Sequence, residues 1–287
     1  MLTLDMRLAT IIALGLLPLL NLAQAPPAFN ADPPKVCDAC DEWNKPRAPY
    51  KVFGNTYYVG TAGLSSVLVT SPAGHVLLDG GLAQSASFID RSIKALGFAT
   101  ADVRYILASH GHYDHVGGVA ALQRASGARV AVSTSTAQAL ERGENTPDDP
   151  QFGFGRAANA FPPVENVQVV ADRETVRVGD VTVTAHLIPG HAPGSTAWTW
   201  QSCEGATCRN IVYADSLTSV SAAGFRYSSD PKRVEAFRQS LDTVAELPCD
   251  ILLAPHPSVA EGKTCRTYAE DGRARLEQRL AEERKGR

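Results

Sequence analysis

A cluster of four metal-ligand side chains constrains this 287-residue chain more than any other feature. The segment from Ser109 to His115 contains three of the seven histidines and one aspartate, as His110, His112, Asp114 and His115. Neutral imidazole nitrogens and carboxylate oxygens are good zinc ligands. Four of them so close together are too many for one ion that keeps an open position. The cluster therefore predicts two metal ions that share one motif.

The local sequence indicates how these side chains converge. Residues 103–108 read as a buried strand that leads directly into the cluster. His110, His112 and Asp114 alternate, so in an extended segment they project to one side. A turn that begins at Asp114 would then bring His115 round to the same place.

Two further histidines lie where additional ligands are needed. His191 follows the predicted strand 181–188, and His256 follows the predicted strand 251–254. Either one alone would more often be an ordinary surface or core residue than a ligand. Ligands gather beyond one set of strand ends in sheets flanked by helices, so these two complete the predicted site. His75 and His186 lie inside strand runs and are left out.

Length and composition limit the classes of protein and partner. The length fits one large domain or two small ones, with ample residues for a buried core. Hydrophobic residues make up 44% of the chain and charged residues 20%, which is an ordinary globular balance. The net charge of −3 and the lack of a basic run argue against nucleic acid as a partner.

The first 25 residues read as a signal peptide. Residues 8–22 are almost wholly apolar, and residues 23–25 supply the small side chains of a cleavage site. Pro18 and Asn21 interrupt the apolar run, which favours cleavage over a permanent membrane span. We therefore expect a periplasmic or secreted protein with no stable membrane association after cleavage.

Six cysteines agree with export, because disulfides persist in an oxidising compartment. Six cysteines allow 15 pairings in principle, and sequence proximity favours three of them. These are Cys37 with Cys40, Cys203 with Cys208, and Cys249 with Cys265. The alternative is zinc binding by the Cys37-x-x-Cys40 thiolates, but no second C-x-x-C exists in the chain.

Residues 26–50 read as an extended N-terminal arm, and residues 51–287 as the folded domain. Predicted helices alternate with the strands of this domain, at 88–96, 116–125, 134–142, 231–247 and 267–287. Residues 143–167 have no periodicity and predict a long loop. Its Phe152, Phe154 and Phe161 could cover a substrate or could simply hold the loop against the body.

The motif H-x-H-x-D-H with two distant histidines resembles the metallo-β-lactamase superfamily, over roughly residues 52–280. The resemblance implies an α/β protein with an αβ/βα four-layer sandwich, in which two sheets lie inside and helices outside. The segment Y-A-D-S-L-T at 213–218, the L-D-G-G at 78–81 and the pair Cys249/Cys265 look like subclass B3. By that resemblance His110, His112 and His191 hold the first zinc ion, and Asp114, His115 and His256 hold the second.

The same resemblance suggests roles for residues around the ligands. Asp79 and Asp215 would support the ligands without touching the metals. In glyoxalase II-like and lactonase-like relatives an aspartate in the region of Asp215 instead bridges both ions, so its position separates the two branches. Ser216 and Thr218 would hold the substrate carboxylate, although both could be ordinary polar residues at a strand end. Phe152 and Phe154 are the remaining candidate substrate contacts.

The implied activity is zinc-dependent hydrolysis of the β-lactam amide bond of penicillins, cephalosporins and carbapenems, giving antibiotic resistance. Two zinc ions would hold the attacking hydroxide, which Asp114 orients. We expect a monomer whose partner is the small-molecule β-lactam substrate. The alternatives are a lactone or thioester hydrolase of the same fold, and a non-catalytic zinc-binding protein. A Cys249–Cys265 disulfide would close a loop of about 17 residues around His256, and we expect it to position that ligand.

Overall fold

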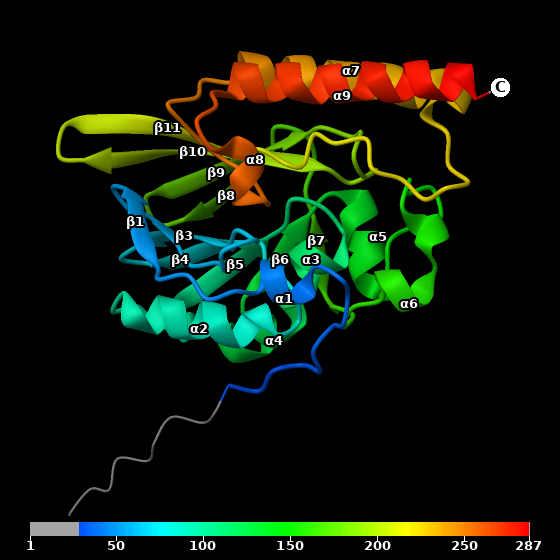
Figure 1. The fold of residues 1–287 in the computed structure, drawn as a ribbon. Coiled ribbons are helices and arrows are strands. Elements are labelled where there is room, and N and C mark those ends of the chain that lie inside the picture. Colours follow the sequence, from blue (N-terminus) through cyan, green and yellow to red (C-terminus); the bar gives the residue numbers. More distant parts are fainter. Residues whose placement is uncertain (1–28, 287) are drawn as a thin grey trace, which may run out of the picture.

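The computed structural model describes residues 29–286, so the expected signal peptide at residues 1–25 lies outside the described residues. Two mixed sheets face each other, and helices cover the outer face of each sheet (Figure 1). The αβ/βα sandwich expected from the motif is confirmed. Among residues 29–286, no helix combines the length and apolar character needed to cross a bilayer.

Seven strands form the first sheet and five form the second. In spatial order the first sheet contains β1 (Tyr50–Phe53), β2 (Thr56–Tyr58), β3 (Val67–Ser71), β4 (Gly74–Leu78), β5 (Val103–Leu107), β6 (Arg129–Val132) and β7 (Val167–Val169). The second contains β12 (Ile251–Leu253), β11 (Thr207–Tyr213), β10 (Thr196–Glu204), β9 (Val181–Leu187) and β8 (Thr175–Val178).

The helices belong to the two outer layers and to the loops at the rim. They are α1 (Cys40–Trp43), α2 (Ser85–Ala95), α3 (Tyr113–Val116), α4 (Val119–Ser126), α5 (Thr134–Arg142), α6 (Arg156–Asn159), α7 (Pro231–Glu246), α8 (Pro257–Ala260) and α9 (Cys265–Lys285). Short 3₁₀ turns occupy η1 (Thr100–Asp102), η2 (Phe152–Phe154) and η3 (Tyr227–Ser229).

Alternation along the strands explains the layers. Successive strand side chains point to opposite faces, so each buried strand serves two cores. Val67 and Val69 of β3 face the second sheet, whereas Leu68 between them packs toward α2 and α4. Val212 of β11 likewise packs toward α7 and α9, while its neighbour Tyr213 lies between the sheets. The strands are apolar on both faces because both faces are covered.

Strand direction brings the predicted ligands to one edge of the sandwich. β11 pairs in parallel with β12, and β10 runs antiparallel to both β9 and β11. Strands β9, β11 and β12 therefore share one direction, and His191, Asp215 and His256 all follow their carboxyl ends. In the first sheet, β5 leads into His110 in the same manner.

The structure corrects one detail of the motif and adds detail to the arm. The turn after His112 begins at Tyr113, not at Asp114, so Asp114 lies in the short helix α3 rather than in an extended segment. The N-terminal arm contains one helical turn, α1, before β1.

The structure contains all three disulfides that sequence proximity favours: Cys37–Cys40, Cys203–Cys208 and Cys249–Cys265.

Candidate metal centre

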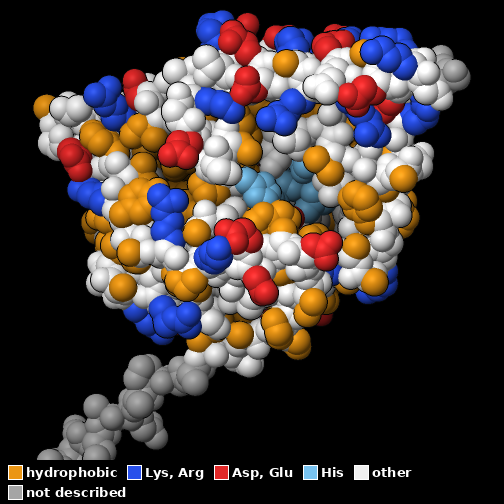
Figure 2. All heavy atoms as spheres, viewed as in Figure 1, with side chains coloured by type: hydrophobic (Ala, Val, Ile, Leu, Met, Phe, Trp, Pro, Cys, Tyr) orange, Lys and Arg blue, Asp and Glu red, His pale blue; other side chains and the backbone are white. Residues whose placement is uncertain are grey.

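Two groups of three side chains meet at the edge of the sandwich. The ligand atoms of His110, His112 and His191 lie within 4.8 Å of one another, and we call these residues the first trio. Those of Asp114, His115 and His256 do the same, and we call these residues the second trio. Figure 2 shows histidine side chains at the bottom of a hollow in this face of the molecule. His75 and His186 lie in strands β4 and β9, as the sequence indicates, and belong to neither trio.

The first trio is held by hydrogen bonds on the far side of each ring. His110 Nδ1 lies 2.7 Å from Asp215 Oδ1, and His112 Nε2 lies 3.0 Å from Asp149 Oδ2. Each carboxylate is an acceptor, so each of these ring nitrogens donates its proton outward. A neutral imidazole carries one N–H, and the inner nitrogens, His110 Nε2 and His112 Nδ1, therefore both present lone pairs. They face each other at 2.9 Å.

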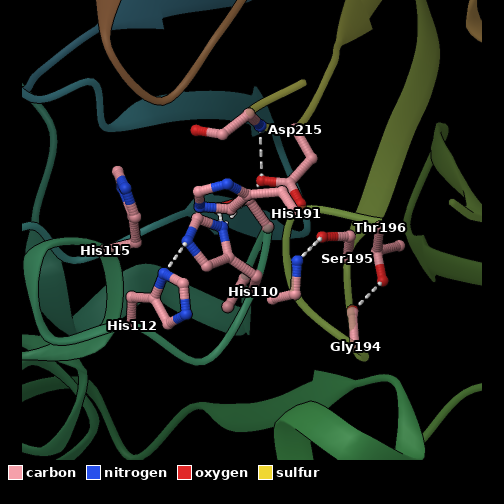
Figure 3. A network of polar contacts seen from close by, with 12 residues as sticks. His110, His112, His115, His191, Gly194, Ser195, Thr196 and Asp215 are labelled. Carbon is pink, nitrogen blue, oxygen red and sulfur yellow. Dashed lines mark hydrogen bonds and ion pairs between the residues drawn. The ribbon is translucent and has the colours of Figure 1, made fainter. Parts of the chain in front are cut away.

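His191 completes this arrangement. Its Nδ1 lies 2.9 Å from the backbone oxygen of Thr218, which makes that nitrogen the donor and leaves Nε2 with a lone pair. Figure 3 shows the three rings gathered together beside Asp215. Lone pairs that converge repel one another unless a cation lies among them. The donor set therefore fits a metal ion, with the outer hydrogen bonds fixing each ring as they do in known metal sites.

Burial keeps His110 and His191 of the first trio neutral. Burial, reinforced by the neighbouring His112, holds the pKa of His110 well below its usual value. Burial together with His110 lowers the pKa of His191 to about 3. Both imidazoles are therefore unprotonated at neutral pH, which is the form that binds a metal.

The second trio is centred on one carboxylate oxygen. Asp114 Oδ2 lies 3.2 Å from His115 Nε2 and 3.3 Å from His256 Nε2. Burial opposes the charge of Asp114, but His115 and His256 outweigh it and hold its pKa well below the usual value. Burial also opposes a charge on His115, but Asp114 and Asp79 outweigh it and raise its pKa to about 9. This trio offers one anionic oxygen and two imidazoles, a donor set that also suits zinc once His115 releases its proton as the ion binds.

Asp79 and Asp215 lie behind the ligands. Asp79 is fully buried, and its carboxylate accepts hydrogen bonds from Ser109 and from the Tyr213 hydroxyl. Its Oδ2 is 3.8 Å from His115 Nδ1, and burial raises its pKa to about 6. Asp215 contacts His110 and the backbone N–H of Ser216, and it belongs to neither trio.

The candidate substrate contacts occupy different settings. Ser216 is buried directly after Asp215, and both the backbone oxygen and the hydroxyl of Thr218 contact His191 Nδ1, at 2.9 Å and 3.1 Å. Phe152 and Phe154 form the ends of η2, and Phe154 is 47% exposed. Phe161, the third phenylalanine of the long loop, is instead buried in the core beneath α5, so this residue holds the loop against the body.

Sequence reasoning missed Asp149, which ties the long loop to the centre. Its Oδ1 accepts hydrogen bonds from Asn145 and from the Gln151 backbone, while Oδ2 faces His112. The loop over 143–167 is therefore linked to the first trio through a buried carboxylate. Nothing in the local sequence marks this residue, because it lies 37 positions from its partner.

The comparisons define the family. The model for the metallo-β-lactamase superfamily matches residues 59–256, and the chain belongs to this superfamily. Rm3 metallo-β-lactamase is 47% identical, with a TM-score of 0.83, and the match covers 87% of this chain and 99% of that one. MEM-A1, a subclass B3 metallo-β-lactamase isolated from a soil metagenome library, is 41% identical with a TM-score of 0.82, covering 85% and 100%. The resemblance to subclass B3 is thus confirmed.

Curated relatives are more distant. The hydroxyacylglutathione hydrolase of Anaeromyxobacter dehalogenans is 31% identical over 181 residues, which is 62% of this chain and 58% of the relative. The N-acyl homoserine lactonase AttM of Agrobacterium fabrum is 30% identical over 153 residues, or 44% and 55%. The chain spans little more than half the length of these relatives.

Proposed function

We propose that this chain hydrolyses the β-lactam amide bond of penicillins, cephalosporins and carbapenems with two zinc ions, and thereby confers antibiotic resistance. The observation that carries the proposal is the pair of converging trios in a chain that matches subclass B3 structures over almost their full length. The position of Asp215 behind His110 supports it, because an aspartate that bridges the ions would favour the thioesterase and lactonase branch.

Each trio would hold one ion. His110, His112 and His191 would hold the first, and Asp114, His115 and His256 the second. When bound, the ions supply a water activated at neutral pH and polarise the amide carbonyl. No side-chain nucleophile is required for this class of hydrolysis.

The protein's own residues would orient the reactants. Asp114 directs Oδ2 toward two histidines, and we assign its Oδ1 to a hydrogen bond that orients the attacking water. The hydroxyls of Ser216 and Thr218 would bind the substrate carboxylate. Phe152 and Phe154 would contact the apolar part of the substrate, on a loop that Asp149 fastens to the first trio.

The curated relatives give a second candidate, hydrolysis of a thioester or an acyl lactone on the same centre.

We place the protein in the periplasm or outside the cell, as a monomer, with the three disulfides formed. Among residues 29–286 the cysteines are all paired, which agrees with an oxidising compartment.

A substrate panel tests the proposal. Purified protein is assayed on a penicillin, a cephalosporin, a carbapenem, an acyl lactone and a glutathione thioester, before and after treatment with a chelator and after zinc is restored. We expect turnover of the three β-lactams that the chelator abolishes and zinc restores. Turnover of the lactone or thioester alone would support the second candidate, and β-lactam turnover that survives the chelator would refute the zinc mechanism.

A further inference from the structure

We propose that Trp43, in the one-turn helix of the N-terminal arm, is a positioning residue for His256 and so controls binding of the second metal ion. The inference rests on the proposed function, because it concerns the ion assigned there to the second trio. Trp43 lies 213 positions from His256 in the chain, yet their ring centroids are 5.2 Å apart with an angle of 52° between the planes.

His256 lacks the kind of support that the first trio has. Among residues 29–286, the polar side-chain contact of its ring is Asp114, which belongs to the same trio. No hydrogen bond within that range fixes its outer nitrogen, whereas His110, His112 and His191 each have such a partner. Its side chain is also 24% exposed at the rim of the hollow. The orientation of this ring therefore depends on what packs against it.

Two aromatic rings provide that packing. The His115 ring contacts His256 edge-on, with centroids 4.9 Å apart and planes at 87°. Because His115 is itself a member of the trio, Trp43 is the contact that does not depend on the metal. A large flat ring against an imidazole restricts the rotation of that imidazole by contact alone.

Trp43 is itself fixed by the loop over residues 60–66. Its backbone oxygen accepts hydrogen bonds from the Thr61 hydroxyl at 2.6 Å and from the Gly63 N–H at 3.1 Å. A Cβ at Gly63 would lie 2.6 Å from the Trp43 Cα, so the close approach of these two segments requires glycine. Trp43 also packs against a small core of Cys40, Leu64 and Leu82.

The same loop holds the chain just before His256. Ser65 donates its backbone N–H to the Pro255 oxygen at 2.8 Å and its hydroxyl to the Ala254 oxygen at 2.7 Å. One segment therefore fixes both Trp43 and the end of β12 from which His256 extends. The relative position of the two rings is consequently set by hydrogen bonds at both ends, and the arm acts as part of the second metal site.

The test measures metal content rather than activity. Wild type, Trp43→Ala, Trp43→Phe and the control Glu42→Ala are dialysed against buffers of graded zinc concentration, and bound zinc is measured by mass spectrometry. Glu42 lies on the same helical turn, is exposed, and pairs only with Lys45 among the described residues. We expect Trp43→Ala to weaken the second equivalent about 10-fold or more, with the first unchanged. We expect Trp43→Phe to recover most of the affinity, and Glu42→Ala to match wild type.

Outcomes that contradict the proposal are distinct from those that contradict the function. Unchanged binding of both equivalents in Trp43→Ala would overturn the positioning role, and so would an equal loss of both equivalents, which would indicate general damage. Failure of the proposed function would instead appear in the wild type, as absent β-lactam turnover. A wild type that binds only one equivalent would overturn both.

Discussion

The two trios of candidate metal ligands, three histidines in the first and two histidines with an aspartate in the second, are supported in different ways. Each histidine of the first trio donates its outer N–H to a fixed acceptor, namely Asp215, Asp149 or the Thr218 backbone. In the second trio, His115 Nδ1 is 3.8 Å from the carboxylate of Asp79 and is buried without a hydrogen bond to any of residues 29–286. His256 depends on ring packing and on the loop that carries it.

This difference separates a preorganised site from an adaptable one. Hydrogen bonds to buried acceptors fix both the tautomer and the orientation of a ring, and acceptors of this kind commonly change metal affinity 10-fold to 100-fold. Packing at a partly exposed rim restricts orientation without fixing the proton. We therefore expect the first trio to bind zinc more tightly, and the second to respond more to changes in distant parts of the chain.

The strongest test of this comparison removes one histidine from each trio. His191→Ala and His256→Ala should each lower β-lactam turnover by at least about 10²-fold, because both ions contribute to charge stabilisation. Their zinc content should differ at low zinc concentration. His256→Ala should retain one tightly bound equivalent, whereas the equivalent that remains in His191→Ala should be weakly bound. Equal retention in the two variants would contradict the proposed order of affinity.

The Asp149→Ala variant tests whether the hydrogen-bond acceptors of the first trio cause the expected difference in zinc affinity between the two trios. Asp149→Ala removes the partner of His112 Nε2 and frees the loop from the first trio. We expect the affinity of the first zinc equivalent to fall about 10-fold to 100-fold, with the second much less affected. Asp148→Ala on the same loop is the matched control. Equal losses for both variants would assign the effect to the loop in general and not to the carboxylate.

The sequence predicted the members of the two trios better than it predicted the residues that contact them, for a physical reason. The ligands crowd into one motif or follow apolar strands, and both features are local. Helix α5 was also predicted with its observed bounds, and in the structure Ser133 caps its start and Gly143 ends it in the left-handed conformation. Asp149 and Trp43 act on partners far away in the chain, so no spacing marks them. Which long-range contacts form is settled only when the layers pack.

Strand β10 (Thr196–Glu204) shows that long-range contacts also limit the prediction of whole elements. β10 is the longest strand of the second sheet, yet no strand was predicted there. Its Trp198 and Trp200 are buried through contacts with the first sheet, which include hydrogen bonds from their indoles to Ala108 and Thr56. Such contacts exist only in the folded sandwich, and the sequence alone does not display them.

Removal of the Cys249–Cys265 disulfide should have an effect of intermediate size on the second trio. It joins the start of α9 to the residues before β12, and the loop between its ends contains His256. Replacing both cysteines by serine should lower the free energy of unfolding by up to about 3 kcal/mol in the chain-entropy model. It should also weaken the second zinc equivalent more than the first. Replacement of the Cys203/Cys208 pair by serine is the control, since that disulfide closes a hairpin away from both trios. Unchanged zinc binding in the Cys249/Cys265 variant would refute the link between this disulfide and the second zinc equivalent.

The smallest expected effect concerns the contacts between α9 and η3 that support the first trio, which we call the frame of the first trio. Glu283 of α9 accepts hydrogen bonds from the backbone N–H groups of Tyr227 and Ser228 and from Arg279 Nε. The Tyr227 hydroxyl in turn donates to the backbone oxygen of Gly190, which precedes His191. Burial opposes the charge on Glu283, but Arg279 and the backbone donors outweigh it and lower its pKa to about 2. A carboxylate with a lowered pKa stabilises the fold above the pKa of the unfolded chain, about 4.3, and that contribution is lost as the pH falls toward 2.

Glu283→Gln should therefore destabilise the protein by about 1–2 kcal/mol at pH 7, a value that allows for solvent screening. The difference from wild type should shrink steadily between about pH 5 and pH 2. Unfolding by urea at several pH values, with a chelator present so that zinc release does not contribute, measures this directly, and the exposed neighbour Glu282→Gln serves as the control. A difference that stays constant across this pH range would show that Glu283 acts through packing and not through its charge. The frame of the first trio would then owe its stability to contacts of the same kind as those that hold His256.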